Sequence, residues 1–239
     1  MNGEVRVVES VPDAFALLVA DRLATAGTDG FSLFLSGGGT AEESYRRLAD
    51  LSGPGGPAGP SVHVDWSRID IYLGDERCVP PDHPDSNHRM IAETLLGPVG
   101  PVRSDHPMYE SGPPDDAAAG YQRLVAALPA FDVVHLGLGP DGHTASLFPD
   151  SVALGIDDPD TLVAANHDPN ANNPHERITL TFPGIARSRL VVFTVSGESK
   201  RSAFQRIAAG DPLPASRVTA EEVIWLVDTA ATGGDPPVH

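Results

Sequence analysis

The stretch that decides the fold is FSLFLSGGGTAEESYRRLADL, residues 31–51. Its first part, Phe31–Leu35, is a compact apolar run that is typical of a buried strand. Three glycines follow, and then the helical stretch Thr40–Leu51, in which Thr40 and the later Glu43 predict a capping box. A buried strand that turns through glycines into a helix is the unit from which parallel α/β sheets are built.

The same alternation of apolar runs and amphipathic stretches continues on both sides of this segment. An edge strand is predicted at Val5–Val8, and further strands at Ile69–Leu73, Val133–Leu138, Leu190–Val195 and Ile224–Val227. Further helices are predicted at Pro12–Ala26, Ser86–Leu96, Pro113–Pro129, Pro183–Ser188 and Ser199–Ala209. Strands that alternate with helices predict parallel crossovers, and therefore an α/β fold whose sheet is covered by helices on both faces.

The domain organisation follows from the absence of an obvious linker. We interpret residues 1–239 as one domain, because no segment resembles a connection between domains. Residues 53–60, GPGGPAGP, are predicted to form a surface loop. An irregular lobe is expected at about residues 150–180, and a flexible tail at about residues 230–239.

Composition and charge exclude several classes of protein. The 239 residues include 16 Lys and Arg against 33 Asp and Glu, and the resulting net charge of −17 repels nucleic acid and anionic membranes. A single cysteine, Cys78, excludes an internal disulfide. No apolar stretch approaches the ~18–20 residues that cross a membrane, and Met1–Ser10 does not resemble a signal peptide. We therefore expect a cytoplasmic protein that binds neither nucleic acid nor membrane.

Polar loops follow three of the predicted strands. These loops are Ser36–Thr40, Gly74–Arg77 and Gly139–Thr144. The carboxyl ends of parallel strands lie along one edge of the sheet, which is where open α/β sheets bind ligands. We therefore expect the three loops to meet at a single site.

The glycine loop is the first candidate for ligand binding. Its glycines let backbone N–H groups approach an anion, and the following helix presents its positive N-terminus, which suits a phosphate. A tight strand-to-helix turn also accounts for the glycines. No lysine follows them, so the loop is not a P-loop. Ser36 is not an esterase nucleophile, because Phe34 replaces the glycine that a nucleophile elbow requires.

Asp141 and His143 are the best candidates for proton chemistry. A neutral imidazole can take a proton from water near neutral pH, and a carboxylate two residues earlier can select its tautomer. A histidine that only caps a turn is an equal alternative. We interpret His135, inside a predicted strand, as a core residue. Residues 137–142, GLGPDG, match a dinucleotide-binding pattern, but the helix that such a site needs does not follow.

Cationic residues near the predicted edge suit an anionic ligand. Arg77 could stabilise an oxyanion, and Asp75 could hold a hydroxyl or the attacking water, although a local ion pair is the alternative. Arg177 opens a β-like run, and Lys200, the only lysine, follows the strand Leu190–Val195. In so acidic a chain an anion needs a local basic pocket, which these residues could supply. A plain surface position for Lys200 remains open.

No metal or other cofactor is predicted. The spacing of the possible ligands Asp82, His83, Asp85 and His88 matches no zinc pattern and is read better as a loop before a helix. Cys78 lies beside Arg77, but no partner residues surround it in the sequence. We interpret this cysteine as structural.

Several collinear segments together resemble the 6-phosphogluconolactonase family. These segments are LSGGGT (35–40), LGDERCVP (73–80) with Ser86-Asn87, GLGPDGHTASLFP (137–149), RITLT (177–181) and GESK (197–200). The resemblance implies a Rossmann-like sheet, shared with glucosamine-6-phosphate deaminases and ribose-5-phosphate isomerases. It also implies hydrolysis of 6-phospho-D-glucono-1,5-lactone in the oxidative pentose phosphate pathway. We expect a monomer whose partner is this small phosphosugar lactone.

The resemblance also implies roles for individual residues. His143 matches the proposed base, and Asp75 and Arg77 lie beside the sugar. The implied anchors for the substrate phosphate are Gly38, Gly39, Thr40, Arg177 and Lys200.

Two other functions are less favoured. The sugar-phosphate deaminases, which resemble the chain next best, have a glutamate five residues after the histidine, where this chain has Phe148. A ligand-sensing domain of a regulator would need a basic DNA-binding segment, which is not seen. One departure from the lactonase pattern is the asparagine-rich stretch Asn166–Pro174, which leaves the contacts to sugar hydroxyls open.

Overall fold

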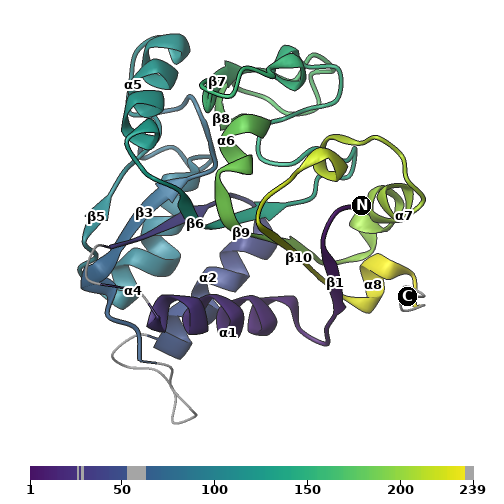
Figure 1. Ribbon diagram of the computed structural model, residues 1–239, viewed down its shortest axis with the longest axis horizontal. Coiled ribbons are helices and arrows are strands. Elements are labelled where there is room, and N and C mark those ends of the chain that lie inside the picture. The colour runs from purple at the N-terminus through teal and green to yellow at the C-terminus, as the bar shows by residue number, and fades with distance from the viewer. Residues whose placement is uncertain (26, 28–29, 53–62, 235–239) are drawn as a thin grey trace.

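The computed structural model describes residues 1–25, 27, 30–52 and 63–234. Its centre is a seven-stranded sheet in the order β1-β10-β9-β6-β2-β3-β5, with every neighbouring pair parallel (Figure 1). The strands are β1 (Glu4–Val7), β2 (Phe31–Leu35), β3 (Ile69–Leu73), β5 (Ser104–Asp105), β6 (Phe131–Gly137), β9 (Ser188–Val195) and β10 (Glu222–Val227). The predicted α/β fold with a mainly parallel sheet is confirmed. The loop predicted at 53–60 lies outside the described residues.

Helices cover both faces of this sheet. In Figure 1, α1 and α2 lie below the sheet, whereas α5 and α6 lie above it. The α-helices are α1 (Val11–Ala24), α2 (Gly39–Ser52), α3 (Asn87–Ile91), α4 (Gly97–Val99), α5 (Pro114–Ala126), α6 (Phe182–Ala186), α7 (Arg201–Ala208) and α8 (Thr229–Thr232). Shorter helical segments are η1 (Trp66–Arg68), the π-helical η2 (Ala92–Leu96), η3 (Val152–Gly155), η4 (Glu198–Lys200) and η5 (Pro214–Arg217).

The core lies around the central strands, which are apolar on both faces. In β9 only Arg189 is exposed, and in β10 every residue after Glu222 is buried. Such uninterrupted apolar strands are expected where helices cover both faces of a parallel sheet. The rings of Phe193 and Trp225 stack between these two strands, with their centroids 3.7 Å apart. Among the described residues, no helix is long and apolar enough to cross a membrane.

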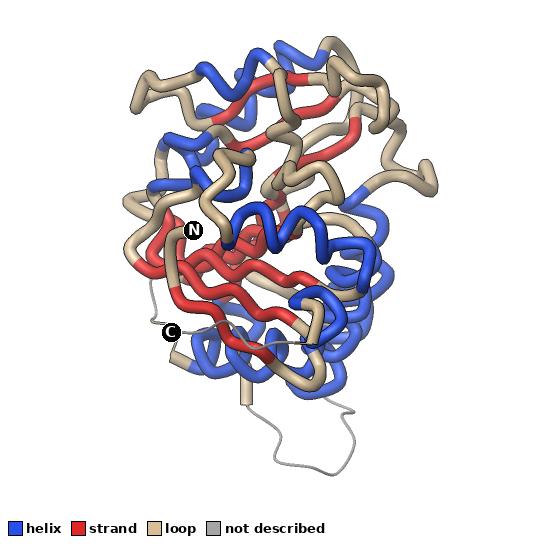
Figure 2. The backbone as a smooth tube through the Cα atoms, turned by 90° about the vertical axis from the view of Figure 1, so that its right-hand side faces the viewer, coloured by secondary structure: helices blue, strands red, loops and turns tan. Residues whose placement is uncertain are grey.

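A second, antiparallel sheet differs from the sequence-based expectation. Its strands are β4 (Asp75–Arg77), β8 (Arg177–Leu180) and β7 (Val163–Asn166), in the order β4-β8-β7. Figure 2 shows it above the large sheet. We expected a loop at 75–77 and an irregular lobe at 150–180, and these expectations were wrong where β4 and β7 lie, whereas β8 matches the β-like run predicted from Arg177. Strands of three and four residues are too short to show the alternation of apolar and polar residues that predicts a strand. In addition, β4 pairs with β8, which lies about a hundred residues later in the chain, and such a distant pairing leaves no local signal.

Two helix boundaries also differ from the prediction. Helix α2 begins at Gly39, so Thr40 lies inside its first turn and is not the N-cap of a capping box. The flexible tail expected at about residues 230–239 is wrong at its start, where α8 extends to Thr232 and buries Ala231. The Asp228 carboxylate accepts the Ala231 N–H (2.7 Å) and so caps this helix. Such a cap satisfies an N–H that a helix start leaves unpaired. Residues 235–239 lie outside the described part of the chain.

The strand order predicts where a ligand binds. From β2 the chain moves to β3 and β5 on one side, whereas β6 leads to β9 and β10 on the other. Such a reversal opens a crevice at the carboxyl ends of the two strands where it occurs. Here these strands are β2 and β6, which the glycine loop and the segment with His143 follow.

Candidate active site

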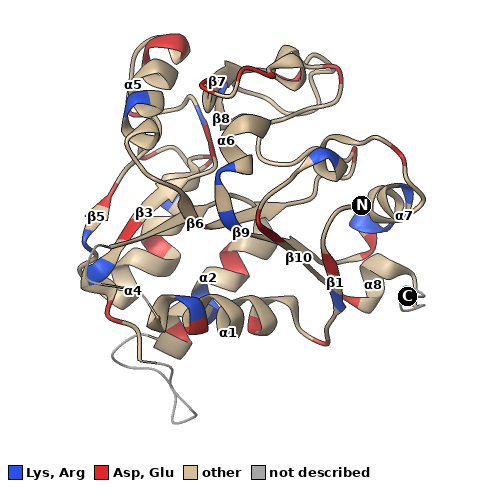
Figure 3. Cartoon of the chain, viewed as in Figure 1, with Lys and Arg blue, Asp and Glu red and all other residues tan. Residues whose placement is uncertain are grey.

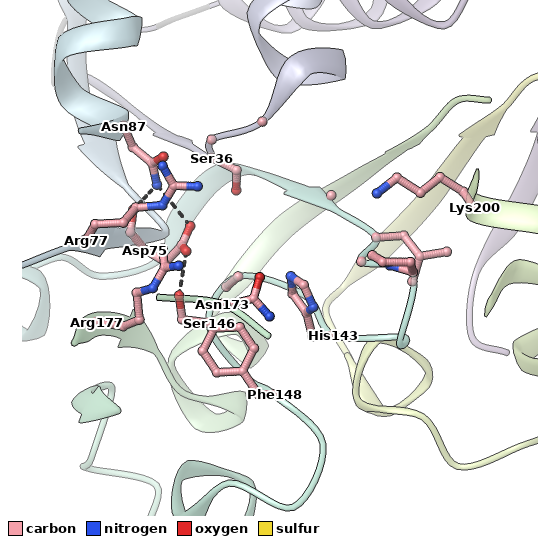
Figure 4. Close-up of a pocket in the computed structure, with 17 residues that line it drawn as sticks. Ser36, Asp75, Arg77, Asn87, His143, Ser146, Phe148, Asn173, Arg177 and Lys200 are labelled. Atoms are coloured by element: carbon pink, nitrogen blue, oxygen red, sulfur yellow. Dashed lines mark hydrogen bonds between the residues drawn. The ribbon is translucent and has the colours of Figure 1, made fainter. Parts of the chain in front are cut away.

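A pocket of about 250 Å³ lies at this carboxyl edge (Figure 4). Loops after β2 and β6, the strands β4 and β8, and the starts of α3 and α7 contribute to its wall. The residues that line it are Ser36, Gly37, Gly38, Asp75, Arg77, Asn87, Gly137, Leu138, Gly139, Pro140, His143, Ala145, Ser146, Phe148, Asn173, Arg177 and Lys200.

The glycine loop is held from below by a buried tyrosine. The Ser36 N–H donates to the Tyr45 oxygen (2.8 Å), and the Tyr45 hydroxyl donates to the Ser36 carbonyl (2.9 Å). Gly37 must be glycine, because a Cβ there would lie 1.9 Å from the Asn87 amide oxygen. Gly38 has a φ of +102°, a conformation that favours glycine. The loop therefore presents its backbone to the pocket at Gly37 and Gly38.

His143 faces the pocket with Asp141 behind it. The imidazole Nδ1 lies 2.5 Å from Asp141 Oδ1, and the same oxygen accepts the His143 backbone N–H (3.1 Å). A Cβ on Gly139 would lie 2.2 Å from Nδ1, so a glycine is needed to make room for the ring. Burial raises the pKa of Asp141, but the hydrogen bonds and the charge of His143 together outweigh this and leave that pKa below its ordinary value. Asp141 is thus ionised at neutral pH and can hold one tautomer of the imidazole.

Asp75 is a buried anchor of the pocket wall. Its carboxylate accepts the Ser146 hydroxyl (2.7 Å), and its backbone carbonyl accepts the Asn87 amide (2.9 Å). Ser146 is itself fixed, because its N–H donates to Thr179 Oγ1 (3.1 Å) in β8. The short sheet thereby joins the loop after β6 to the loop after β3.

Arg77 and Arg177 lie opposite each other on the paired strands β4 and β8. Arg77 Nη1 donates to the Asp85 carbonyl (2.5 Å), and Arg177 Nη2 donates to the Pro174 carbonyl (2.9 Å). The Nε of each guanidinium is buried without a partner in the described part of the chain. Burial lowers the pKa of Arg177, an effect that Asp75 opposes and the Arg77 charge adds to. Two neighbouring guanidinium groups that line one pocket are suited to binding an anion.

Lys200 approaches the pocket from a different direction. It ends η4 at the start of α7, and Figure 4 draws it on the side opposite the two arginines, with His143 between them. Burial lowers its pKa, although the Asp141 charge partly offsets this. Figure 3 shows Asp and Glu spread over many elements of both layers. Arg77, Arg177 and Lys200 therefore form a local cluster of positive charge in a molecule whose net charge is negative.

Phe148 separates His143 from Arg177. Its ring meets the imidazole edge-on, with centroids 5.0 Å apart, and the Arg177 guanidinium lies 5.8 Å from its centroid. Phe148 is buried apart from its face toward the pocket. The position at which the resemblance implies a glutamate in deaminases thus holds an apolar ring beside the histidine.

The structure brings together most of the candidate residues. Six of the nine line the pocket, namely Gly38, Asp75, Arg77, His143, Arg177 and Lys200. Asp141 supports His143 from behind, and Gly39 and Thr40 form the first turn of α2 beside the pocket.

Sequence reasoning gave no role to Asn87, Ser146 or Asn173. Ser86, where a helix was predicted to begin, could have indicated Asn87, since the Ser86 hydroxyl accepts the Arg89 N–H (3.1 Å) at the start of α3. Ser146 follows Ala145, whose φ is +46° although it is not glycine, and no sequence pattern announces such a conformation.

Other residues considered from the sequence lie outside the pocket. His135 is fully buried between Tyr45 (2.7 Å) and Thr194 (2.8 Å), and burial lowers its pKa to about 3, as befits a core histidine. His88 contacts Asp105 (2.8 Å), whereas Asp85 contacts His175 (2.9 Å).

Two further possibilities are a metal site and a reactive thiol. Over residues 1–25, 27, 30–52 and 63–234, no three His, Cys, Asp or Glu side chains gather as a metal site would require. Burial raises the pKa of Cys78 to about 11, which keeps its thiol protonated.

Comparison with known proteins identifies the family. A model of the family described as glucosamine-6-phosphate isomerases/6-phosphogluconolactonase matches residues 4–225. The chain belongs to this isomerase/lactonase family. The 6-phosphogluconolactonase of Synechocystis sp. is 39% identical over 215 residues, which cover 84% of this chain and 82% of that protein. The 6-phosphogluconolactonase of Nostoc sp. is 36% identical and covers 95% of this chain and 97% of its own length.

A solved structure extends the family likeness to three dimensions. The 6-phosphogluconolactonase of Thermotoga maritima superposes with a TM-score of 0.76 at 31% identity, covering 95% of this chain and all of that one. The isomerase/lactonase family therefore accounts for the parallel sheet and for nearly the whole described chain.

Proposed function

We propose that the chain hydrolyses 6-phospho-D-glucono-1,5-lactone to 6-phosphogluconate, in the oxidative pentose phosphate pathway. The observation that carries this proposal is the Asp141–His143 pair, 2.5 Å apart, in a pocket whose other walls hold two guanidinium groups and one ammonium group. A base with a fixed tautomer suits attack by water on a neutral ester. The cations suit a substrate that has one anionic end and gains negative charge at the other. The curated relatives at 36–39% identity are 6-phosphogluconolactonases, which supports the same reaction.

His143 acts as the base in this proposal. Its Nδ1–H donates to Asp141, so the lone pair of Nε2 is available to a water molecule in the pocket. Nε2 takes a proton as the water oxygen bonds to the lactone carbonyl carbon. The bond from that carbon to the ring oxygen then breaks, and the imidazolium returns the proton to the ring oxygen. Asp141 stays ionised throughout and stabilises the imidazolium.

Arg77 and Arg177 serve the reacting end. The carbonyl oxygen gains negative charge in the tetrahedral intermediate, and the product is a carboxylate. Two guanidinium groups that line the pocket therefore bind the transition state and product more tightly than the neutral lactone. One well-placed donor to such an oxyanion contributes about 3–4 kcal/mol. The resemblance implies a phosphate contact for Arg177 instead; we propose the reacting end because Arg177 stands opposite Arg77 in the strand register and across the pocket from Lys200.

The substrate phosphate needs an anion site of its own. We assign it to Lys200 and to the backbone N–H groups of Gly38, Gly39 and Thr40, where the glycine loop enters α2. The first N–H groups of a helix lack intrahelical partners and lie at the positive end of its dipole. Contacts at this remote group hold the lactone carbonyl beside His143.

The test is a lactone-hydrolysis assay with substrate made freshly by glucose-6-phosphate dehydrogenase. His143→Ala removes the base, so we expect kcat to fall by about two to four orders of magnitude while 6-phosphogluconate still binds. His88→Ala is the matched control, because it also removes a histidine paired with a carboxylate, but outside the pocket. A His143→Ala variant with near wild-type kcat would contradict the assignment.

The alternative function is that of a sugar-phosphate deaminase, and a second assay tests it. Phe148 beside His143 offers no second acid or base for ring opening and proton transfer. We expect no ammonia release from glucosamine 6-phosphate by the wild-type protein. Ammonia release at a rate comparable to lactone hydrolysis would overturn the proposal.

The setting of the enzyme is also a proposal. A cytoplasmic location is supported by the substrate, because a sugar phosphate is too highly charged to cross a membrane and must be used where it forms. The net charge of −17 supports the absence of nucleic acid as a partner. We propose a monomer, which light scattering after size exclusion would test; a mass near 50 kDa would contradict it, since one chain has 25.1 kDa.

A further inference from the structure

The segment between β7 and β8 is held in a conformation that its sequence would not adopt alone. It contains the asparagine-rich stretch that departs from the lactonase pattern. Ala171 has a φ of +55° and His175 a φ of +72°, although neither is glycine. Left-handed backbone at such residues persists only where the surrounding contacts enforce it.

Asp168 supplies those contacts. Its carboxylate accepts three backbone N–H groups, those of Asn170 (2.9 Å), Asn172 (3.1 Å) and Asn173 (3.0 Å). It also accepts the side-chain Nδ2 of Asn173 (2.8 Å). Burial raises the pKa of Asp168, but these hydrogen bonds, that of the Asn173 side chain first, outweigh burial and lower it. The carboxylate is therefore a charged centre around which the segment folds.

The result is that Asn173 presents one defined atom to the pocket. One N–H of its Nδ2 donates to Asp168, which fixes the orientation of the amide and leaves Oδ1 without a partner among the described residues. Asn173 lines the pocket, and Figure 4 draws its oxygen toward the side where Ser36 lies. An oriented carboxamide oxygen accepts hydrogen bonds but cannot donate them.

The chemistry of the pocket restricts what such an acceptor can bind. Arg77, Arg177 and Lys200 are donors and pair with the anionic ends of the ligand. The oxygen of Asn173 repels those ends and needs a neutral donor. In a phosphorylated sugar lactone the donors are the hydroxyl groups of the ring. A site built to hydrogen-bond a hydroxyl rejects an analogue that lacks it, because its own polar group is then left unpaired.

We propose that Asn173 accepts a hydrogen bond from one ring hydroxyl of the substrate and so determines sugar specificity, with Asp168 as its positioning residue. This inference rests on the proposed lactonase function. It assigns the hydroxyl contact that the sequence left open.

The experiment compares 6-phosphogluconolactone with its 2-deoxy, 3-deoxy and 4-deoxy counterparts. We expect wild-type kcat/KM to fall about tenfold or more on the one analogue that lacks the recognised hydroxyl. Asn173→Ala should lose a similar factor on the full lactone and no longer distinguish it from that analogue. Asn172→Ala is the matched control, because it removes the neighbouring asparagine, which is exposed and does not line the pocket.

A second arm tests the role of Asp168. Asp168→Asn removes the charge that holds the Asn173 amide, so it should show the same loss of discrimination. Combined with Asn173→Ala it should cause no further loss of discrimination, since residues that act through one contact are not additive. If Asp168 only stabilised the fold, Asp168→Asn would lower kcat/KM by the same factor on all four lactones. The variant would then discriminate among the lactones as well as the wild-type protein does.

The outcomes separate this inference from the proposed function. If the wild-type protein hydrolyses 6-phosphogluconolactone and Asn173→Ala matches it on every lactone, the inference is wrong and the function stands. An equal loss by Asn173→Ala on all four lactones would point to an effect on the attacking water and would also overturn the inference. If the wild-type protein hydrolyses none of them, the proposed function fails and the inference fails with it.

Discussion

At the scale of single residues, the pocket separates its cations into two groups. Arg77 and Arg177 come from paired strands of the small sheet, whereas Lys200 comes from the start of α7. The reaction needs a fixed anion site for the phosphate and a second site where charge develops. Separate cations allow binding and transition-state stabilisation to be changed independently.

Lys200→Ala should therefore affect binding, and Arg177→Ala should affect the chemical step. We expect Lys200→Ala to raise KM for the phosphorylated lactone about tenfold or more and to spare slow activity on unphosphorylated gluconolactone. Arg177→Ala should lower kcat on both lactones. Steady-state kinetics measures both effects, with Arg201→Ala as the control, because Arg201 pairs with Glu198 (3.1 Å) outside the pocket. Equal losses on both lactones for Lys200→Ala would count against a phosphate contact.

His135 gives the protein a pH-dependent stability that is independent of the active site. Burial lowers its pKa to about 3, whereas an unfolded histidine has a pKa of about 6.5. Between these values the unfolded chain binds a proton that the folded chain does not, so stability falls as the pH falls. Urea unfolding at pH 6.5, 5.5 and 4.5 should show His135→Gln losing about 1 kcal/mol less per pH unit than the wild-type protein. Parallel losses in the two proteins would contradict the buried neutral histidine.

At the scale of elements, α3 opens a continuous helical stretch that runs on through η2 and α4 to Val99, and its start depends on a single carboxylate. The buried Glu76 accepts the N–H groups of Asn87 and His88 (both 2.8 Å) and the Ser86 hydroxyl (3.1 Å). Burial raises the pKa of Glu76, although these N–H groups pull it down. The first N–H groups of a helix have no partner within it, and the Glu76 carboxylate supplies one. Glu76 therefore holds Asn87 against the glycine loop and the pocket.

Glu76→Gln should disturb this element and the pocket together. The amide supplies one acceptor in place of a carboxylate and leaves buried donors unpaired, which costs about 1–3 kcal/mol of stability. We expect kcat/KM to fall about tenfold through displacement of Asn87. Glu93→Gln is the control, because Glu93 is exposed and forms an ion pair with Arg89, one helical turn earlier. An unchanged kcat/KM in a destabilised Glu76→Gln protein would remove the link to the pocket.

At the scale of the whole molecule, the two sheets are joined where the pocket lies. Gly74 donates its N–H to the Leu35 carbonyl in the large sheet (2.8 Å) and accepts the Leu180 N–H from the small sheet (2.8 Å). Ser146 links the loop after β6 to β4 and β8. We propose on this basis that the chain is a single domain, as its sequence indicated.

A single domain predicts a single unfolding transition. Calorimetry should give equal calorimetric and van't Hoff enthalpies, and 6-phosphogluconate should raise the whole transition because it binds only the folded protein. Two transitions, of which the ligand shifts one, would instead divide the chain into two units.

Much of the fold could be predicted because its signals are local. Phe31–Leu35 and Ile69–Leu73 match β2 and β3, since a short apolar run that ends at a glycine is typical of a strand buried in a parallel sheet. Of the small sheet only β8 was predicted, as the β-like run from Arg177, because β4 has three residues and is stabilised by pairing with β8. For the same reason, the sequence could not show that Arg77 and Arg177 are neighbours.

The sequence by itself determined the chemical inventory of this protein: a carboxylate two residues before a histidine, a glycine loop before a helix, and cations after strands. These are features of neighbouring residues, and backbone and side-chain preferences act over that range. Only the tertiary structure decided which of these groups share a pocket, that Lys200 faces the arginine pair across His143, and that Asn173 enters the wall. The physical reason is that these positions follow from strand pairing and from the hydrogen bonds of Asp75 and Asp168, which join residues that are distant in the chain or hold them in conformations they would not adopt alone.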